Sequence, residues 1–137
     1  MAGEANKLLS TYQSILGAAS VGAGGVSGES AAIGSVANSA YILLDFKVTV
    51  SAGTVNTGET VEIIRRASDG TTKQPAPDAT YRQRSVQAVT LKAGGGAFYA
   101  YGVSNVDDGD TFYLFNNGLN ALTLALEVRP RTSTTAP

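Results

Sequence analysis

The feature that most constrains the fold is a run of alternating apolar residues that starts just after position 40. Within AYILLDFKVTVS (residues 40–51), every second residue is a large aliphatic or aromatic one, namely Ile42, Leu44, Phe46, Val48 and Val50. A period of two places these side chains on one face of an extended chain, which is typical of a half-buried β-strand. A strand of this length needs a sheet around it and a second layer over its apolar face.

The remainder of the chain repeats this pattern between turn signals. Further strands are expected at residues 60–66, 82–92, 97–103, 111–116 and 119–131. Turns are expected at Asp69-Gly70, at the three glycines 94–96 and at Asn117-Gly118, because Gly, Asn and Asp favour turn conformations. No helical periodicity lies between the strands, which excludes βαβ units. Residues 41–130 are therefore predicted to form an all-β, antiparallel β-sandwich, followed by a polar tail at 131–137.

The first forty residues have a different composition and are predicted to form an N-terminal arm. Apolar residues from Leu8 to Leu16 fall at i, i+1, i+4, i+7 and i+8, which predicts a short amphipathic helix over residues 4–16, ended by Gly17. Residues 17–40 are mostly Gly, Ala and Ser with a single charge, Glu29. Such a strip buries too little apolar area to order by itself. The helix either packs on its own domain or docks on a neighbour.

The apolar residues of this arm are its candidate contacts with a partner. A backbone of small residues with spaced aliphatic side chains is able to lie close against another protein. The predicted partner-binding set is Leu8, Leu9, Tyr12, Ile15, Leu16, Val21, Val26, Ile33 and Val36.

The composition removes most catalytic chemistry. The chain has no His and no Cys, which excludes Ser-His-Asp and Cys-His nucleophile systems and the common zinc sites. A carboxylate pair of the glycosidase type remains an alternative. The acidic cluster of Asp107, Asp108 and Asp110 resembles a calcium loop, but it lacks the spacing of an EF-hand and is favoured as an Asp/Gly turn. We expect no enzyme activity, no catalytic residues, no metal site and no cofactor.

The charge balance bears on partners. Lys and Arg number 10 against 11 Asp and Glu, and charged residues make up only 15% of the chain, against about 25% in a typical domain. No basic patch predicts nucleic-acid binding, since Arg65 and Arg66, with Arg82 and Arg84, have acidic neighbours in sequence. No apolar run is long enough to span a membrane, and the N-terminus is a poor export signal. So few charges favour a protein packed against copies of itself or against a larger surface.

Tyrosines mark a second surface feature. Tyr99 and Tyr101 alternate with Phe98 and Ala100, so one pair is expected to face the core and the tyrosines to face outward. Exposed tyrosines serve sugar stacking or protein interfaces. The absence of Trp counts against sugar binding.

Three short motifs carry a resemblance to a known group. They are AGTV (residues 52–55) after the long opening strand, VEIIRRASDGT (residues 61–71), and the closing YLFNNGLNALTLALEVRP (residues 113–130). Their order resembles the head decoration, or cement, proteins of tailed bacteriophages, which often have S-x-DGT after a hydrophobic strand and an L-x-N-N-x-G turn. Here Gly118 follows Asn117 directly, a small departure. The likeness spans residues 41–130 and does not include the arm.

The resemblance implies a jelly-roll-like sandwich, commonly a trimer, bound to the major capsid protein on the exterior of a virion assembled in the host cytoplasm. It carries over no residue roles, because the group has no defined functional motif. The leading hypothesis is thus a homo-oligomeric capsid decoration protein that stabilises the head, with the arm making inter-subunit contacts. The alternative is a tail-fibre or carbohydrate-binding β-sandwich module, which predicts a local aromatic and polar groove.

Overall fold

The computed structural model describes residues 7–8, 11–33, 42–68, 71–80, 85–103 and 109–132, with side chains described at 11–33, 44–68, 71–80, 85–102 and 109–129. All regular elements in these ranges are β-strands. They are β1 (Lys7–Leu8), β2 (Gln13–Val21), β3 (Ile42–Ala52), β4 (Thr60–Arg66), β5 (Ser85–Thr90), β6 (Gly96–Val103), β7 (Thr111–Asn116) and β8 (Leu122–Thr132).

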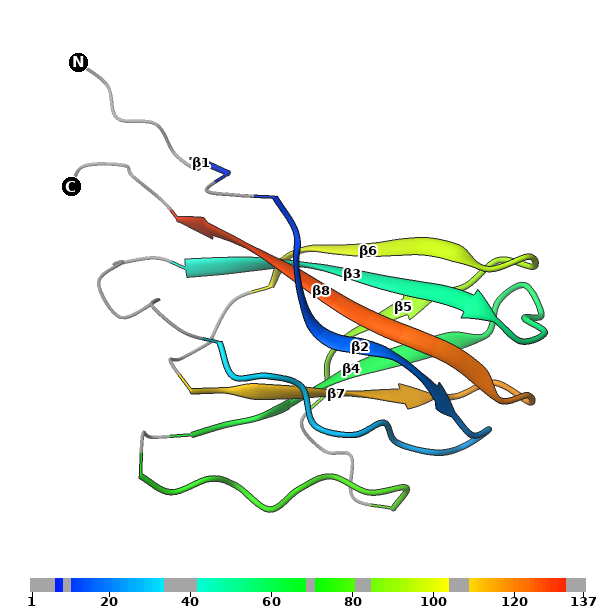
Figure 1. Ribbon diagram of the computed structural model, residues 1–137, viewed down its shortest axis with the longest axis horizontal. Helices are drawn as coiled ribbons and strands as arrows, with labels where there is room; N and C mark the ends of the chain where they lie inside the picture. The colour runs from blue at the N-terminus through cyan, green and yellow to red at the C-terminus, as the bar shows by residue number, and fades with distance from the viewer. Residues whose placement is uncertain are drawn as a thin grey trace.

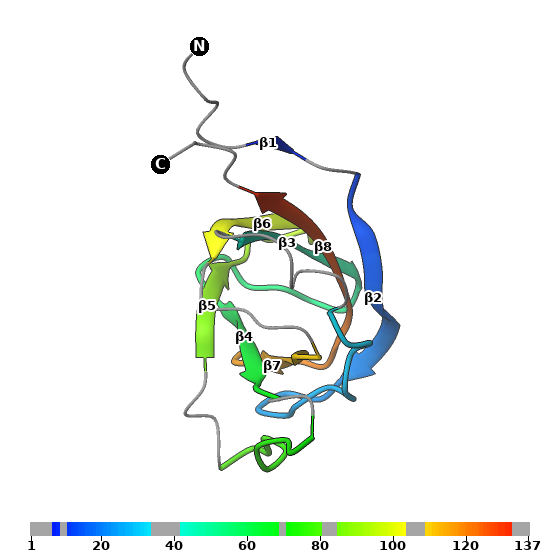
Figure 2. The ribbon, with the colours of Figure 1, turned by 90° about the vertical axis from the view of Figure 1, so that its left-hand side faces the viewer.

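The strands form two antiparallel sheets that face each other (Figures 1 and 2). In the first sheet β8 lies between β3 and the N-terminal strands β1 and β2, and β6 follows β3 at the far edge. The second sheet has the order β5-β4-β7. The all-β, antiparallel, two-layer fold expected from the sequence is confirmed.

The predicted helix over residues 4–16 is wrong. Residues 7–8 form β1 and residues 13–16 begin β2, and β2 pairs with β8 from Gln13 opposite Val128 to Val21 opposite Leu122. A helix of about thirteen residues is marginal without a partner surface, whereas the edge of β8 offers backbone pairing to both ends of this segment, at residues 7–8 and from Gln13 onward. Bulges after Ser14 and Leu16 break the period-two pattern of β2, so the adjacent residues Ile15 and Leu16 both pack partly against the core.

The core lies between the two sheets and follows the predicted faces. Leu44, Phe46 and Val48 of β3 have no exposed surface. The rings of Phe46 and Phe112 meet edge to face at 5.0 Å between their centroids and join the two layers. Each such buried side chain contributes about 1.5–3 kcal/mol of transfer free energy. Further aliphatic residues of the strands and their ends are also buried, namely Val50, Val61, Ile63, Val89, Leu91, Leu122, Leu124, Leu126 and Val128.

The motifs that carried the resemblance shape the ends of strands. Asn116 organises the β7–β8 connection: its Oδ1 accepts a hydrogen bond from the Gly118 N–H at 2.8 Å, and its Nδ2 donates to the Asn120 carbonyl at 2.8 Å. Gly53 after β3 has a φ of +101°, and a Cβ there would lie 2.4 Å from the Ala121 carbonyl oxygen. Only glycine permits both this backbone conformation and the close approach of the two turns.

Candidate functional site

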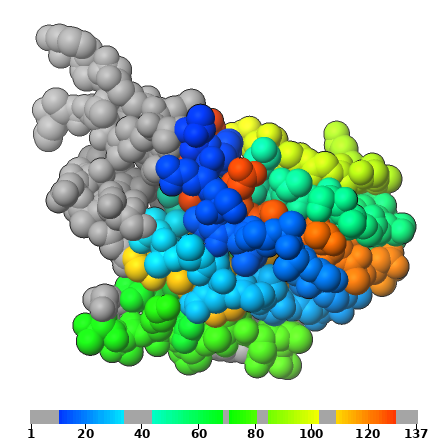
Figure 3. Space-filling view, viewed as in Figure 1, coloured from blue at the N-terminus to red at the C-terminus, as the bar shows by residue number. Residues whose placement is uncertain are grey.

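The N-terminal segment, the first candidate site, lies along its own domain (Figures 2 and 3). After β2 the chain crosses to the second sheet and runs beside β7, where the N–H groups of Ser27 and Ser30 donate to the carbonyls of Leu114 and Phe112 at 2.8 and 2.9 Å. Residues 13–33 thereby cover the edge of β8 in one sheet and the edge of β7 in the other. The segment closes one side of the sandwich.

Two serine hydroxyls complete the pairing with β7. Ser27 Oγ accepts the Leu114 N–H and Ser30 Oγ accepts the Phe112 N–H, both at 2.9 Å. In a regular ladder a backbone carbonyl accepts such donors, and here the side chain replaces it because Ser27 and Ser30 are three residues apart rather than two. Sequence reasoning missed this role, although the S-x-x-S spacing within a run of small residues was its visible signal.

The structure places the predicted partner-binding residues as follows. Val21 and Ile33 are buried in the core, Ile15 and Leu16 pack partly against it, and Tyr12 is half-buried. Val26 packs on a second apolar cluster formed by Ile64, Tyr113 and Phe115. Leu8 belongs to β1, while Leu9 and Val36 lie outside the described residues. The buried side chains offer no surface to a partner.

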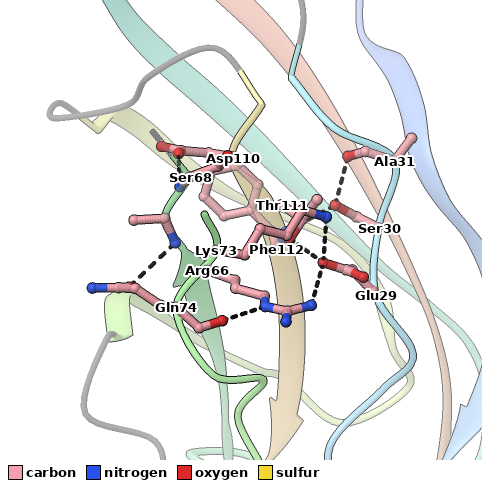
Figure 4. A network of polar contacts seen from close by, with 11 residues as sticks. Glu29, Ser30, Ala31, Arg66, Ser68, Lys73, Gln74, Asp110, Thr111 and Phe112 are labelled. Carbon is pink, nitrogen blue, oxygen red and sulfur yellow. Dashed lines mark hydrogen bonds and ion pairs between the residues drawn. The ribbon is translucent and has the colours of Figure 1, made fainter. Parts of the chain in front are cut away.

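Glu29 links the N-terminal segment to the second sheet through polar contacts (Figure 4). Its Oε2 accepts a hydrogen bond from Thr111 Oγ1 at 2.5 Å and forms ion pairs with Arg66 Nη1 at 3.1 Å and Lys73 Nζ at 3.4 Å. The Thr111 hydrogen bond, followed by the two cations, lowers the pKa of Glu29 against an opposing effect of burial. The carboxylate thus links the segment to β4, to β7 and to the loop that follows β4.

In the acidic turn before β7, the described residue Asp110 holds other parts of the chain in place. Asp110 has no exposed surface; it pairs with Arg65 Nε at 2.6 Å and accepts the Ser68 N–H at 3.0 Å (the latter in Figure 4). Asp107 and Asp108 lie outside the described residues. Among the residues that are described, no three metal-ligating side chains lie together.

The second candidate site is a row of aromatic rings on the outer face of the first sheet. Tyr99 and Tyr101 are 45% and 62% exposed, and their parallel rings stack with 5.7 Å between centroids. Tyr12 reaches over from the β2 side, 5.9 Å from Tyr99, and the Arg129 guanidinium lies 4.4 Å from the Tyr12 ring. We call Tyr12, Tyr99 and Tyr101 the tyrosine face. The sequence-based expectation of outward tyrosines on β6 is confirmed.

Paired charges lie beside and beneath these rings. Asp45 has no exposed surface; it pairs with Arg129 Nη2 at 3.0 Å and accepts the Gly102 N–H at 3.0 Å. Lys47 and Glu127, more exposed, pair at 3.5 Å. Burial raises the pKa of Tyr12, and the Tyr12 hydroxyl has no hydrogen-bond partner among the described residues. The face combines exposed aromatic surface with ion pairs that are already formed.

Comparisons of this chain with protein-family models, with curated proteins and with solved structures found no match. Within the described ranges, no helix has the length and apolar character needed to cross a membrane.

Proposed function

We propose that this protein is a virion structural protein of a tailed phage, a capsid decoration protein that binds the major capsid protein and stabilises the head. The observation that carries the proposal is the way the resembling motifs pair. The opening strand β3 pairs with the closing strand β8 in the first sheet, and β4 pairs with β7 in the second. The consecutive strands β3 and β4 thus lie antiparallel to the later strands β8 and β7, one pair in each sheet. This arrangement supports the jelly-roll-like sandwich that the resemblance implies.

The use of the carboxylates supports a structural role. Asp45, Asp110 and Glu29 each hold two or more groups of their own chain. Glu59 accepts the backbone N–H groups of Asn56 and Leu119. Carboxylates committed in this way stabilise the fold, whereas a hydrolase needs an acid pair directed at a substrate across a cleft.

The position of the N-terminal segment changes which residues serve the assembly. Because residues 13–33 build the domain, we assign the contacts with the capsid protein or with a sister subunit to residues 1–10. β1 lies in this stretch, at the end of β8, with Lys7 opposite Thr132 and Leu8 opposite Arg131. Leu8 and Leu9 are the members of the predicted partner-binding set that belong to it.

Deleting the coding sequence from the phage that carries it tests this function. Purified wild-type virions should contain the chain in a fixed ratio to the major capsid protein. Virions of the deletion mutant should lack the corresponding external density in electron cryomicroscopy. On heating, they should lose infectivity at a lower temperature than wild-type virions do. Complementation with a chain lacking residues 1–10 should supply a folded protein that no longer binds the heads. Absence of the chain from purified wild-type virions would overturn the proposed function. Full occupancy by the truncated chain would overturn the assignment to residues 1–10.

A further inference from the structure

On the outer side of the first sheet, the tyrosine face lies next to several short side chains. In the strand register Lys47 of β3 is opposite both Tyr99 of β6 and Glu127 of β8. Two residues along, Thr49 is opposite Ala97 and Ala125. Directly opposed residues share a face of the sheet with their Cβ atoms about 5 Å apart. The tyrosines of the edge strand therefore border a row of short side chains, with the Lys47–Glu127 pair between.

Among the side chains that the structure describes, the charges on this face lie in pairs. Lys47 pairs with Glu127, and Arg129 with Asp45. The side chains of Lys47 and Glu127 are each 29% exposed, so an ammonium donor and a carboxylate acceptor reach the surface in fixed positions beside the rings. A polyanion such as a nucleic acid or an acidic polymer requires cations without such partners. The face instead matches a neutral ligand that has both an apolar surface and hydroxyl groups.

The exposed apolar area that the described residues contribute to this face is small. Tyr99 and Tyr101 are the large exposed hydrophobic residues of this face, and the third in the described part of the chain, Leu119, lies in the β7–β8 turn. A stable interface between proteins buries about 1,200–2,000 Å² with an apolar centre. Two exposed rings flanked by ion pairs fall short of that. They suit a ligand of the size of a few sugar rings, because a pyranose presents a C–H face to an aromatic ring and hydroxyls around its edge.

We propose that the tyrosine face binds a neutral oligosaccharide. A pyranose ring stacks on Tyr99 and Tyr101, and its hydroxyls exchange hydrogen bonds with the Lys47 ammonium and the Glu127 carboxylate. The Asp45–Arg129 pair and the Tyr12 ring hold the platform from beneath and from the β2 side. This binding site is additional to the proposed attachment to a capsid and does not depend on it.

Tyrosine fluorescence offers a direct assay, because the chain has no Trp. The full-length protein is titrated with cellohexaose, maltohexaose, mannohexaose and N-acetylchitohexaose up to about 10 mM, which detects millimolar affinity. At least one sugar should change the fluorescence and shift the ring resonances of Tyr99 and Tyr101 in NMR spectra. Tyr101→Ala should weaken that binding roughly tenfold, the value of one aromatic stacking contact. Tyr101→Phe should retain it.

Leu119→Ala is the matched control, since it removes another exposed apolar side chain away from this face, and it should bind as the unaltered protein does. Sugar binding by each variant is measured at a temperature at which the same fraction of the protein is folded, as judged from its thermal midpoint. The proposal is overturned if none of the four sugars binds, if Tyr101→Ala binds as tightly as the original chain, or if polygalacturonate binds more tightly than every neutral sugar. It is also overturned if the Tyr99 and Tyr101 resonances shift with protein concentration alone, because a second copy of the chain then occupies the face.

Discussion

Two fully buried aspartates, Asp45 in β3 and Asp110 just before β7, are each held by an arginine and by a backbone N–H. Asp45 pairs with Arg129 of β8 in the first sheet, and Asp110 pairs with Arg65 of β4, the middle strand of the second sheet. Both arginine side chains are 19% exposed, so each pair has one buried and one partly hydrated member. Removing one partner of such a pair leaves the other without compensation in a poorly hydrated site.

Asp45→Ala is expected to lower the free energy of unfolding by about 3 kcal/mol, because it leaves Arg129 without its carboxylate and the Gly102 N–H without its acceptor. Glu127→Gln is the control on the same face: it breaks the partly exposed pair with Lys47 and should cost less than about 1 kcal/mol. Urea denaturation of both variants measures the difference. Equal losses in the two variants would show that burial of Asp45 has no energetic consequence.

Glu29 predicts a specific loss of stability in acid. Its pKa is lowered in the folded chain from an ordinary value of 4.5, so the folded state binds this proton more weakly than the unfolded state does. The resulting stabilisation is present above about pH 5 and is lost as the pH falls through the folded pKa. Glu29→Gln should therefore be less stable at pH 7 by up to about 1 kcal/mol, a small value because the carboxylate is partly hydrated. In urea titrations the difference should shrink toward zero as the pH falls through the folded pKa; a difference that stays constant with pH would contradict this.

At the scale of elements, the segment beside β7 acts as an edge strand whose acceptors are partly side chains. A strip of Gly, Ala and Ser has little β propensity of its own. Its order comes from β7, which supplies donors and acceptors along one edge, and from Val26 and Ile33, which are packed against the two apolar clusters. The composition that predicted a loose arm in isolation is also what permits close approach to a strand.

Replacing the two serines tests this arrangement. In Ser27→Ala/Ser30→Ala, the N–H groups of Leu114 and Phe112 lose their acceptors, and the Phe112 donor is buried. The double variant should be destabilised by roughly 1–3 kcal/mol, and those two amides should exchange with deuterium faster than their neighbours in β7. Ser20→Ala removes an exposed serine of β2 and should leave both measurements unchanged. Unaltered protection of Phe112 and Leu114 in the double variant would show that the hydroxyls are dispensable.

At the scale of the whole molecule, the N-terminal segment and the C-terminal strand depend on each other. β8 lies between β2 and β3 in its sheet, and Val21 and Ile33 of the N-terminal segment belong to the same core as Leu122 and Leu126 of β8. The chain thus closes one side of the sandwich with its beginning and fills the middle of the first sheet with its end.

Truncation separates the two parts of the N-terminus. A chain lacking residues 1–33 loses two core side chains and exposes the edges of β7 and β8, so we expect it to be unfolded or aggregated. A chain lacking residues 1–10 keeps all of β2 and should melt within about 5 °C of the full chain. Circular dichroism melts and size-exclusion chromatography distinguish these outcomes. A cooperative melt of the shorter chain at the original temperature would show that residues 11–33 are an appendage after all.

The sequence by itself determined the strands and their buried faces from residue 42 onward. A period of two with large apolar residues at every second position has one low-energy arrangement, with Leu44, Phe46 and Val48 inward and the outward tyrosines of β6 on the other side. Local turn chemistry marked the ends of these strands in the same way. Both the period-two pattern and the turn residues involve neighbours in the sequence, so they can be recognised without knowledge of the fold.

Only the tertiary structure decided what the first part of the chain does. Its apolar spacing fitted a helix, and its small residues fitted a free arm, because neither pattern contains the edges of β7 and β8 against which they pack. The ladder hydrogen bonds of β2, the acceptor roles of Ser27 and Ser30 and the ion pairs of Glu29 all join residues about 37 to 115 positions apart. Such contacts form when the folded sheets bring their partners together. The S-x-x-S spacing of Ser27 and Ser30 is visible in the sequence, but no local pattern identifies the strand that these residues pair with.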